Sequence, residues 1–71
     1  MNIKMPSGNT LILPADKVVI DRERGTIDLQ QRSVWWNCYE YAGTDEQGIA
    51  YAGEFIETVH NDGHSKKGRK P

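Results

Sequence analysis

Cysteine is nearly absent from this 71-residue chain, and the single one, Cys38, rules out an intrachain disulfide. Small secreted domains commonly rely on several disulfides, because a short chain buries little apolar surface. A chain without such cross-links is typical of a reducing compartment, so we expect the protein in the cytoplasm. The aliphatic runs are also short, three residues at 11–13 and at 18–20, which predicts neither a membrane-spanning segment nor a secretory signal.

The residue types that carry catalysis and metal binding occur only in weak patterns. His60 and His64 have an H-x3-H spacing, but two histidines without a matching cysteine pair fall short of a structural zinc set. Cys38 is a lone thiol, and no glycine-rich phosphate loop is present. Glu40 and Glu54 would do acid–base work only in a pocket that so short a chain has little room to enclose. The sequence therefore predicts a protein that is not an enzyme and holds no metal or other cofactor.

Charge of the two signs is unevenly distributed along the chain. Residues 1–59 hold five basic and nine acidic side chains, a net charge of −4, whereas residues 60–71 hold four basic and one acidic, a net charge of +3. The last residues also lack apolar side chains that could anchor them. Composition thus predicts one folded domain over residues 1–60 and a disordered basic tail over residues 61–71. The basic side chains of that tail are Lys66, Lys67, Arg69 and Lys70.

The most regular alternation of apolar and polar residues surrounds the sequence Arg-Glu-Arg-Gly at residues 22–25. A glycine that closes a four-residue turn between two alternating runs is typical of a β-hairpin. We expect the register that pairs Asp21 with Thr26, because it gives the hairpin one apolar face. That face collects Val18, Ile20, Ile27 and Leu29.

A second turn of the same kind, Asp-Glu-Gln-Gly at residues 45–48, follows an aromatic-rich segment. A type I turn with a glycine bulge sets Asp45 opposite Ile49, so odd-numbered residues face odd-numbered ones. The odd face is the more apolar and is the expected core: Trp35, Tyr39, Tyr41, Ile49, Tyr51, Phe55 and Val59. The even face collects Val34, Trp36, Cys38, Glu40, Ala50, Ala52, Glu54, Ile56 and Thr58. It sets Glu40 opposite Glu54, a pair of like charges that is tolerable only in water.

Residues 45–60 also fit a helical pattern. Thr44 and Gln47 have capping-box spacing, and five apolar side chains share one helical face. Against a helix, Gly48 and Gly53 would each cost about 1 kcal/mol relative to alanine. The β-branched and aromatic content also favours a strand, which is the structure we expect.

Two short extended pieces around residues 6–8 precede the hairpins, and Pro6 and Pro14 favour sheet edges for them. The predicted fold is therefore mainly β: a small antiparallel meander of about five strands, as an SH3-like barrel or an open sheet. The alternative is an α+β fold, with β-hairpins followed by a C-terminal helix at about residues 45–60.

Four of the six aromatic residues lie in the stretch RSVWWNCYEY, residues 32–41. Because a small domain commonly uses its aromatic residues as core, we expect Trp35, Tyr39 and Tyr41 to be buried. By alternation Trp36 lies on the opposite face, where it is either covered by the fold or exposed as an interaction hot spot.

By elimination, the leading functional hypothesis is a non-enzymatic protein-binding module, a small regulator or inhibitor that docks on a larger protein or complex. Short chains of this sort are common among phage and mobile-element accessory proteins. The expected partner surface consists of Trp36, Arg32, Glu40, Glu54, Asp45 and Glu46. An exposed edge strand would also permit a homodimer. The second hypothesis is a nucleic-acid-binding module with a base-stacking strand and a phosphate-attracting tail, which the charge of −4 on residues 1–59 disfavours.

Overall fold

A computed structural model describes residues 1–60, and the expected tail with Lys66, Lys67, Arg69 and Lys70 lies outside the described residues. Six strands form one sheet in the order β2-β1-β6-β5-β4-β3. Their bounds are β1 (Asn2–Lys4), β2 (Thr10–Ile12), β3 (Val18–Asp21), β4 (Thr26–Leu29), β5 (Trp35–Thr44) and β6 (Ala50–His60), with one 3-10 turn, η1 (Ala15–Lys17), before β3. Among the described residues, no helix is long and apolar enough to cross a membrane.

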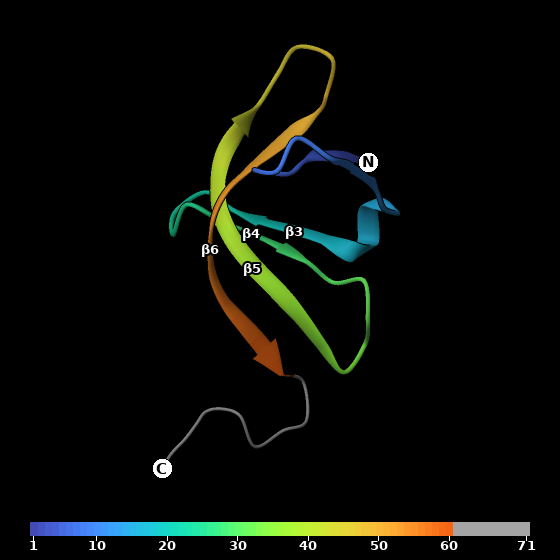
Figure 1. Ribbon diagram of the computed structural model, residues 1–71, viewed down its shortest axis with the longest axis vertical. Helices are drawn as coiled ribbons and strands as arrows, with labels where there is room; N and C mark the ends of the chain where they lie inside the picture. Colours follow the sequence, from blue (N-terminus) through green and yellow to red (C-terminus); the bar gives the residue numbers. More distant parts are fainter. Residues whose placement is uncertain (61–71) are drawn as a thin grey trace.

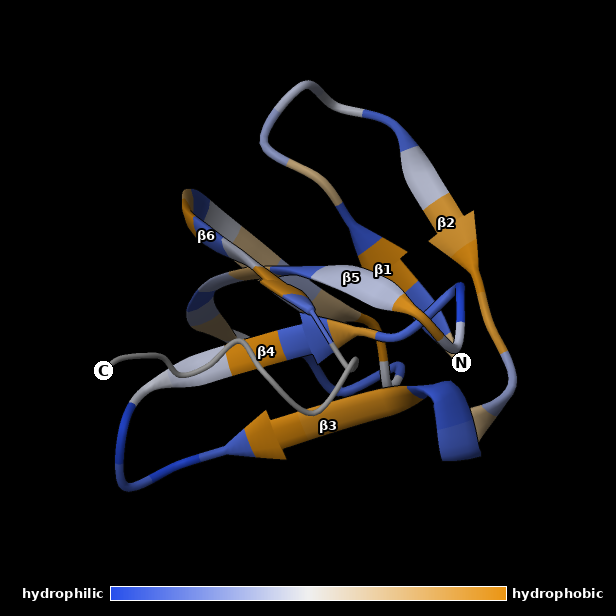
Figure 2. Ribbon diagram, turned by 90° about the horizontal axis from the view of Figure 1, so that it is seen from below, coloured by the Kyte–Doolittle hydropathy of each residue, from blue (hydrophilic) through white to orange (hydrophobic). Residues whose placement is uncertain are grey.

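The sheet curls into an open half-barrel, with β1 and β2 on one side and β3 and β4 on the other (Figures 1 and 2). This confirms the mainly β fold. The alternative helix at residues 45–60 is wrong, because that segment is the turn and strand β6. Strands β3 to β6 form an antiparallel meander, but β1 joins the sheet parallel to β6, with Ile3 opposite Ala50. The first strand thus packs beside the last.

The first predicted hairpin has the expected register. Strands β3 and β4 pair Asp21 with Thr26 and continue in step to Val18 and Leu29. The Asp21 carboxylate caps the turn, since its Oδ1 accepts hydrogen bonds from the backbone N–H groups of Glu23 and Arg24, each at 3.1 Å. Hydrogen bonds of this kind join residues that are close in sequence, which explains why the turn could be predicted from residue types alone.

The second turn also forms as expected, but the strands that leave it do not stay in register. The backbone N–H of Asp45 donates to the carbonyl oxygen of Ile49 at 3.0 Å, and Gly48 has a φ of 86°. Beyond the turn, Thr44 pairs with Ala50 and the next pair is Tyr41 with Ala52, so β5 holds one extra residue. Such a bulge reverses the side to which the following residues point.

Gly43 lies in that bulge with a φ of 103°, a conformation that side chains disfavour. Because of this bulge, the predicted assignment of β6 residues near the turn to the core face and the outer face is wrong. Ala50 and Ala52, assigned to the outer face, are buried, whereas Tyr51, assigned to the core, is exposed. A register expectation based on strict alternation could not include this shift, because the residue count between two strands does not show where a bulge lies.

Two further extra residues lie on β6. Tyr39 pairs with Phe55 as expected, but Cys38 pairs with Glu57, so Ile56 is the additional residue between these pairs. The shift continues to the end of the hairpin, where Val59 lies opposite Trp36. Val59 therefore shares the side of Trp36 and not that of Trp35, contrary to the predicted grouping.

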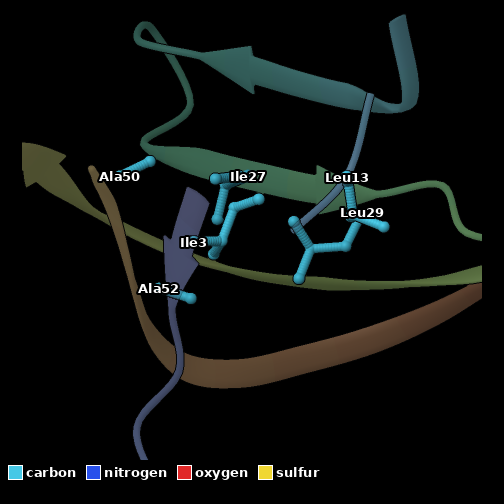
Figure 3. Close-up of a cluster of buried hydrophobic side chains, with 6 residues drawn as sticks. All are labelled: Ile3, Leu13, Ile27, Leu29, Ala50 and Ala52. Atoms are coloured by element: carbon cyan, nitrogen blue, oxygen red, sulfur yellow. The ribbon is translucent and has the colours of Figure 1, made fainter. Parts of the chain in front are cut away.

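The core is a cluster of buried aliphatic side chains inside the curl (Figure 3), contributed by β1, the segment after β2, β4 and β6: Ile3, Leu13, Ile27, Leu29, Ala50 and Ala52. Tyr39 and Tyr41 pack against this cluster and are half-buried, in line with the expectation. Trp35 is not core, because 39% of its surface is exposed. Strand β4 ends at Leu29, opposite Asn37, so it does not extend beside Trp35.

Candidate partner-binding surface

The β5–β6 hairpin extends beyond the strands on both of its sides, as the long curved pair in Figure 1 shows. Strand β4 pairs with β5 only as far as Asn37. On the other side, β1 pairs with β6 only at Ala50 and Tyr51. At its far end, residues 35–36 and 59–60, the hairpin is therefore a two-stranded ribbon within residues 1–60, and its core-side face carries the exposed Trp35.

The side chains on that face point to the same side of the sheet as the core residues. Because Tyr39 packs against the core, residues two and four positions before it on β5 point to the same side. Their partners on β6 complete three cross-strand pairs: Trp35 with His60, Asn37 with Thr58 and Tyr39 with Phe55. We call these six residues the distal strip: Trp35, Asn37, Tyr39, Phe55, Thr58 and His60.

Specific contacts hold the distal strip in place. The rings of Tyr39 and Phe55 meet edge to face, with centroids 5.7 Å apart and planes at 72°. The Thr58 hydroxyl donates to Oδ1 of Asn37 at 2.9 Å. Both ends of the strip are open to solvent, since Phe55 is 54% and Trp35 39% exposed. Two exposed aromatic rings thus lie on one face of the hairpin, with a polar pair between them.

Arg32 stacks on the outermost ring of the strip. Its guanidinium carbon lies 5.6 Å from the centroid of the Trp35 ring, a cation–π distance. The pairing was not predicted, because the expectation joined Arg32 to Trp36. The bend at residues 31–34 brings Arg32 back over the first residue of β5, and no residue pattern in the sequence indicated which indole it would cover.

Trp36 lies on the outer face and is half-buried. It pairs with Val59, and its indole Nε1 is buried without an acceptor among the described residues. The sequence left open whether Trp36 is buried or exposed, and in the structure its side chain is partly buried. Of the two neighbouring tryptophans, Trp35 is the more exposed residue.

The outer face of the hairpin is acidic around a buried thiol. Asp28 of β4, Cys38 of β5 and Glu57 of β6 lie side by side across three strands. Cys38 is only 2% exposed. Burial, a hydrogen bond with Asp28 and the charges of Asp28 and Glu57 raise the pKa of Cys38 from 9.0 to about 12. The thiol is therefore protonated at neutral pH and is a poor nucleophile.

The residues predicted as the partner surface do not form one compact patch. Trp36 and Asp45 are nine residues apart on one hairpin, which at the rise of a strand separates them by roughly 30 Å. Glu40 lies near the middle, where a side chain at position 53 would meet it: a Cβ added to Gly53 would be 3.2 Å from the Glu40 Cβ. Glu40 therefore lies across from Gly53, one residue from the predicted partner Glu54.

Asp45 and Glu46 lie in the turn at the opposite end from Trp35. The Asp45 carboxylate is occupied within the turn: Oδ1 accepts from the N–H groups of Gln47 and Ile49 at 2.9 Å, and Oδ2 accepts from the Tyr51 hydroxyl at 3.1 Å. The hydrogen bond from Ile49, followed by the others, lowers the pKa of Asp45. Its first role is thus structural, whereas Glu46 is exposed.

No group of three or more His, Cys, Asp or Glu side chains within residues 1–60 is placed to hold a metal ion. His64 and the tail cations lie outside the described residues. Comparison of the chain with known protein families, with characterised proteins and with solved structures finds no significant match in any of the three. Within residues 1–60, the distal strip is therefore the surface considered for function.

Proposed function

We propose that this protein is a non-enzymatic protein-binding module whose partner docks on the distal strip and on Arg32. The observation that carries the proposal is the exposure of Trp35 and Phe55 on the uncovered continuation of the core face. Exposed aromatic side chains with an arginine beside them are among the residue types that dominate binding energy at protein interfaces. A module this small acts on its partner by occupying a surface, as small regulators and inhibitors do.

The way the strip is built supports this use. Its backbone belongs to two paired strands, so binding costs little ordering of the main chain. Its rings already have defined contacts, Phe55 with Tyr39 and Trp35 with Arg32. A partner that covers these rings gains about 25 cal/mol of binding free energy for each Å² of apolar surface removed from water, and the fold need not rearrange first.

The test is capture of partner proteins on the immobilised full-length chain, with a cell lysate from the source of the gene. Wild type is compared with the Trp35→Ala/Phe55→Ala double variant and with Ile12→Ala, a control that removes the most exposed aliphatic side chain, at 77%, from the distant strand β2. We expect a defined protein retained by wild type and by the control but lost from the double variant. Equal retention by all three chains would refute the proposal, as would a wild-type chain that retains nothing above the empty support.

Nucleic-acid binding is a second candidate, favoured by one observation, the stacked pair of Arg32 and Trp35. Arginine and aromatic side chains are the groups that stack on single-stranded bases. The charges around the strip oppose it, since Asp28 and Glu57 lie on the other face of the same hairpin. Titration of single-stranded oligonucleotides at low salt, followed by tryptophan fluorescence, decides between the candidates. Quenching that is lost in Trp35→Phe would favour nucleic acid, whereas unchanged fluorescence would remove this candidate.

A further inference from the structure

The second edge of β6 is open over most of its length. Strand β1 occupies that edge at Ala50 and Tyr51 and ends at Lys4. The chain then turns away at residues 5–9, where the N–H of Met5 donates to the carbonyl oxygen of Asn9 at 2.7 Å. From residue 52 to residue 59, no strand within residues 1–60 pairs with this edge.

An open edge presents backbone N–H and C=O groups that a further strand can pair with. The most regular part lies furthest from β1. Residues 57–60 pair in unbroken register with residues 35–38, whereas bulges interrupt β6 on the other side of Glu57. Bulges hinder strand addition, so the regular end is the better template.

The charges beside this edge indicate what kind of strand would fit. Glu54 and Glu57 are exposed, and neither forms an ion pair within residues 1–60. A second copy of this chain that paired antiparallel about Glu57 would set the two Glu57 side chains directly opposite each other, and like charges in that position are destabilising. A strand with basic side chains would instead place a cation beside Glu57, in line with Asp28 and Cys38 of the next strands.

We infer that the free edge of β6 accepts an extended, basic segment of a partner protein as an added strand, centred on residues 57–59. The added strand lies in the sheet position of β1, beyond the end of β1. Lysine or arginine side chains alternate with apolar ones, so that the basic residues lie beside Glu57 on the outer face and the apolar residues lie on the side of the distal strip. This inference rests on the proposed protein-binding function and specifies the conformation and charge of the partner segment.

The probes are three capped octapeptides: alternating Lys and Val, alternating Glu and Val, and the Lys–Val sequence with every backbone nitrogen methylated, so that neither edge of the peptide can donate a hydrogen bond. Each is titrated into the full chain labelled with ¹⁵N, and amide shifts are followed. We expect the Lys–Val peptide to shift the amides of residues 57–59 most and to slow their hydrogen exchange. The Glu–Val peptide should bind far more weakly, and the methylated peptide should not bind, because it cannot complete the ladder.

Two variants make the test specific. Glu57→Lys should weaken the Lys–Val peptide by about three- to tenfold, the size of a lost cross-strand ion pair replaced by repulsion, and should improve the Glu–Val peptide. Glu46→Lys, in the turn at the far end of the hairpin, is the matched control and should leave the Lys–Val affinity within about twofold.

Other outcomes overturn the inference. Shifts centred on β2 or β3, equal binding of the methylated peptide, or a wild-type dimer in sedimentation that protects the amides of residues 57–59 would each exclude an added basic strand. The proposed protein-binding function is tested separately, by the lysate experiment. If the lysate partner is still lost from the Trp35→Ala/Phe55→Ala variant while no peptide binds, the protein-binding function remains and only the strand inference fails.

Discussion

Tyr39 and Phe55, the pair at the core end of the distal strip, meet edge to face at 5.7 Å. Tyr39 packs against the buried cluster, whereas Phe55 is 54% exposed. The same cross-strand pair thus anchors one ring in the fold and offers the other to solvent. The relationship separates residues that stabilise the protein from residues that are free to bind.

The first prediction compares the loss of stability when Phe55 is truncated with the loss when a core residue is truncated. Phe55→Ala should lower the free energy of unfolding by less than about 1.5 kcal/mol, because it removes one aromatic pair and little buried area. Ile27→Ala, at a fully buried position, should cost about 2–5 kcal/mol. Urea denaturation measures both values. A cost for Phe55→Ala equal to that of Ile27→Ala would place Phe55 in the core and contradict the distal strip.

The second prediction concerns the close approach of β5 and β6 at Gly53. A Cβ at this position would lie 3.2 Å from the Cβ of Glu40, which is fixed close to the backbone. Gly53→Ala should therefore destabilise the fold by about 1–3 kcal/mol, as overpacking does. The Glu40→Gly/Gly53→Ala double variant should be more stable than the sum of the two single changes predicts, and additivity in urea denaturation would argue against the contact.

The third prediction concerns the acid side of the pH profile. Because hydrogen bonds lower the pKa of Asp45 from 3.8, the folded state binds this proton less tightly than the unfolded state does. The resulting stability is fully present above pH 3.8 and is lost as the pH falls through the lower folded pKa. Asp45→Asn should be less stable than wild type at neutral pH, and the difference should shrink in strong acid. Thermal unfolding from pH 7 to pH 2 measures this, with Glu46→Gln as the neighbouring control.

The fourth prediction concerns the alkaline side. The pKa of Cys38 is about 12 in the fold and 9.0 for an ordinary thiol, so between these values the unfolded chain has lost a proton that the folded chain retains. Stability should therefore fall as the pH rises from about 9 towards 12. Cys38→Ala should fall less steeply over that range.

Thiol reactivity checks the same environment at neutral pH. A disulfide reagent should modify Cys38 of the native protein far more slowly than Cys38 of the urea-unfolded protein, since burial and a raised pKa both hold back the thiolate. Equal rates in the two states would show that Cys38 is accessible and would contradict the acidic, covered outer face.

Local signals explain what could be predicted. The turns at residues 22–25 and 45–48 each have an acid before or at the start and a glycine at the end, and both form the expected hairpins. The sides of β5 were also correct, with Tyr39 and Tyr41 on the core and Trp36 on the outer face. The partner surface stays a prediction, and the structure distributes Trp36, Glu40 and Asp45 along the hairpin.

The sequence by itself determined the mainly β fold, the position of the turns and the register of the first hairpin, because these depend on residues that are neighbours in the chain. Only the tertiary structure decided three things: where β5 and β6 bulge, that β1 joins parallel to β6, and that Trp35 extends beyond the end of β4. These features depend on how a curled sheet closes around a small core. The curl of the sheet is accommodated by bulges that shift the register, and the alternation of apolar residues in the sequence does not show where such bulges lie.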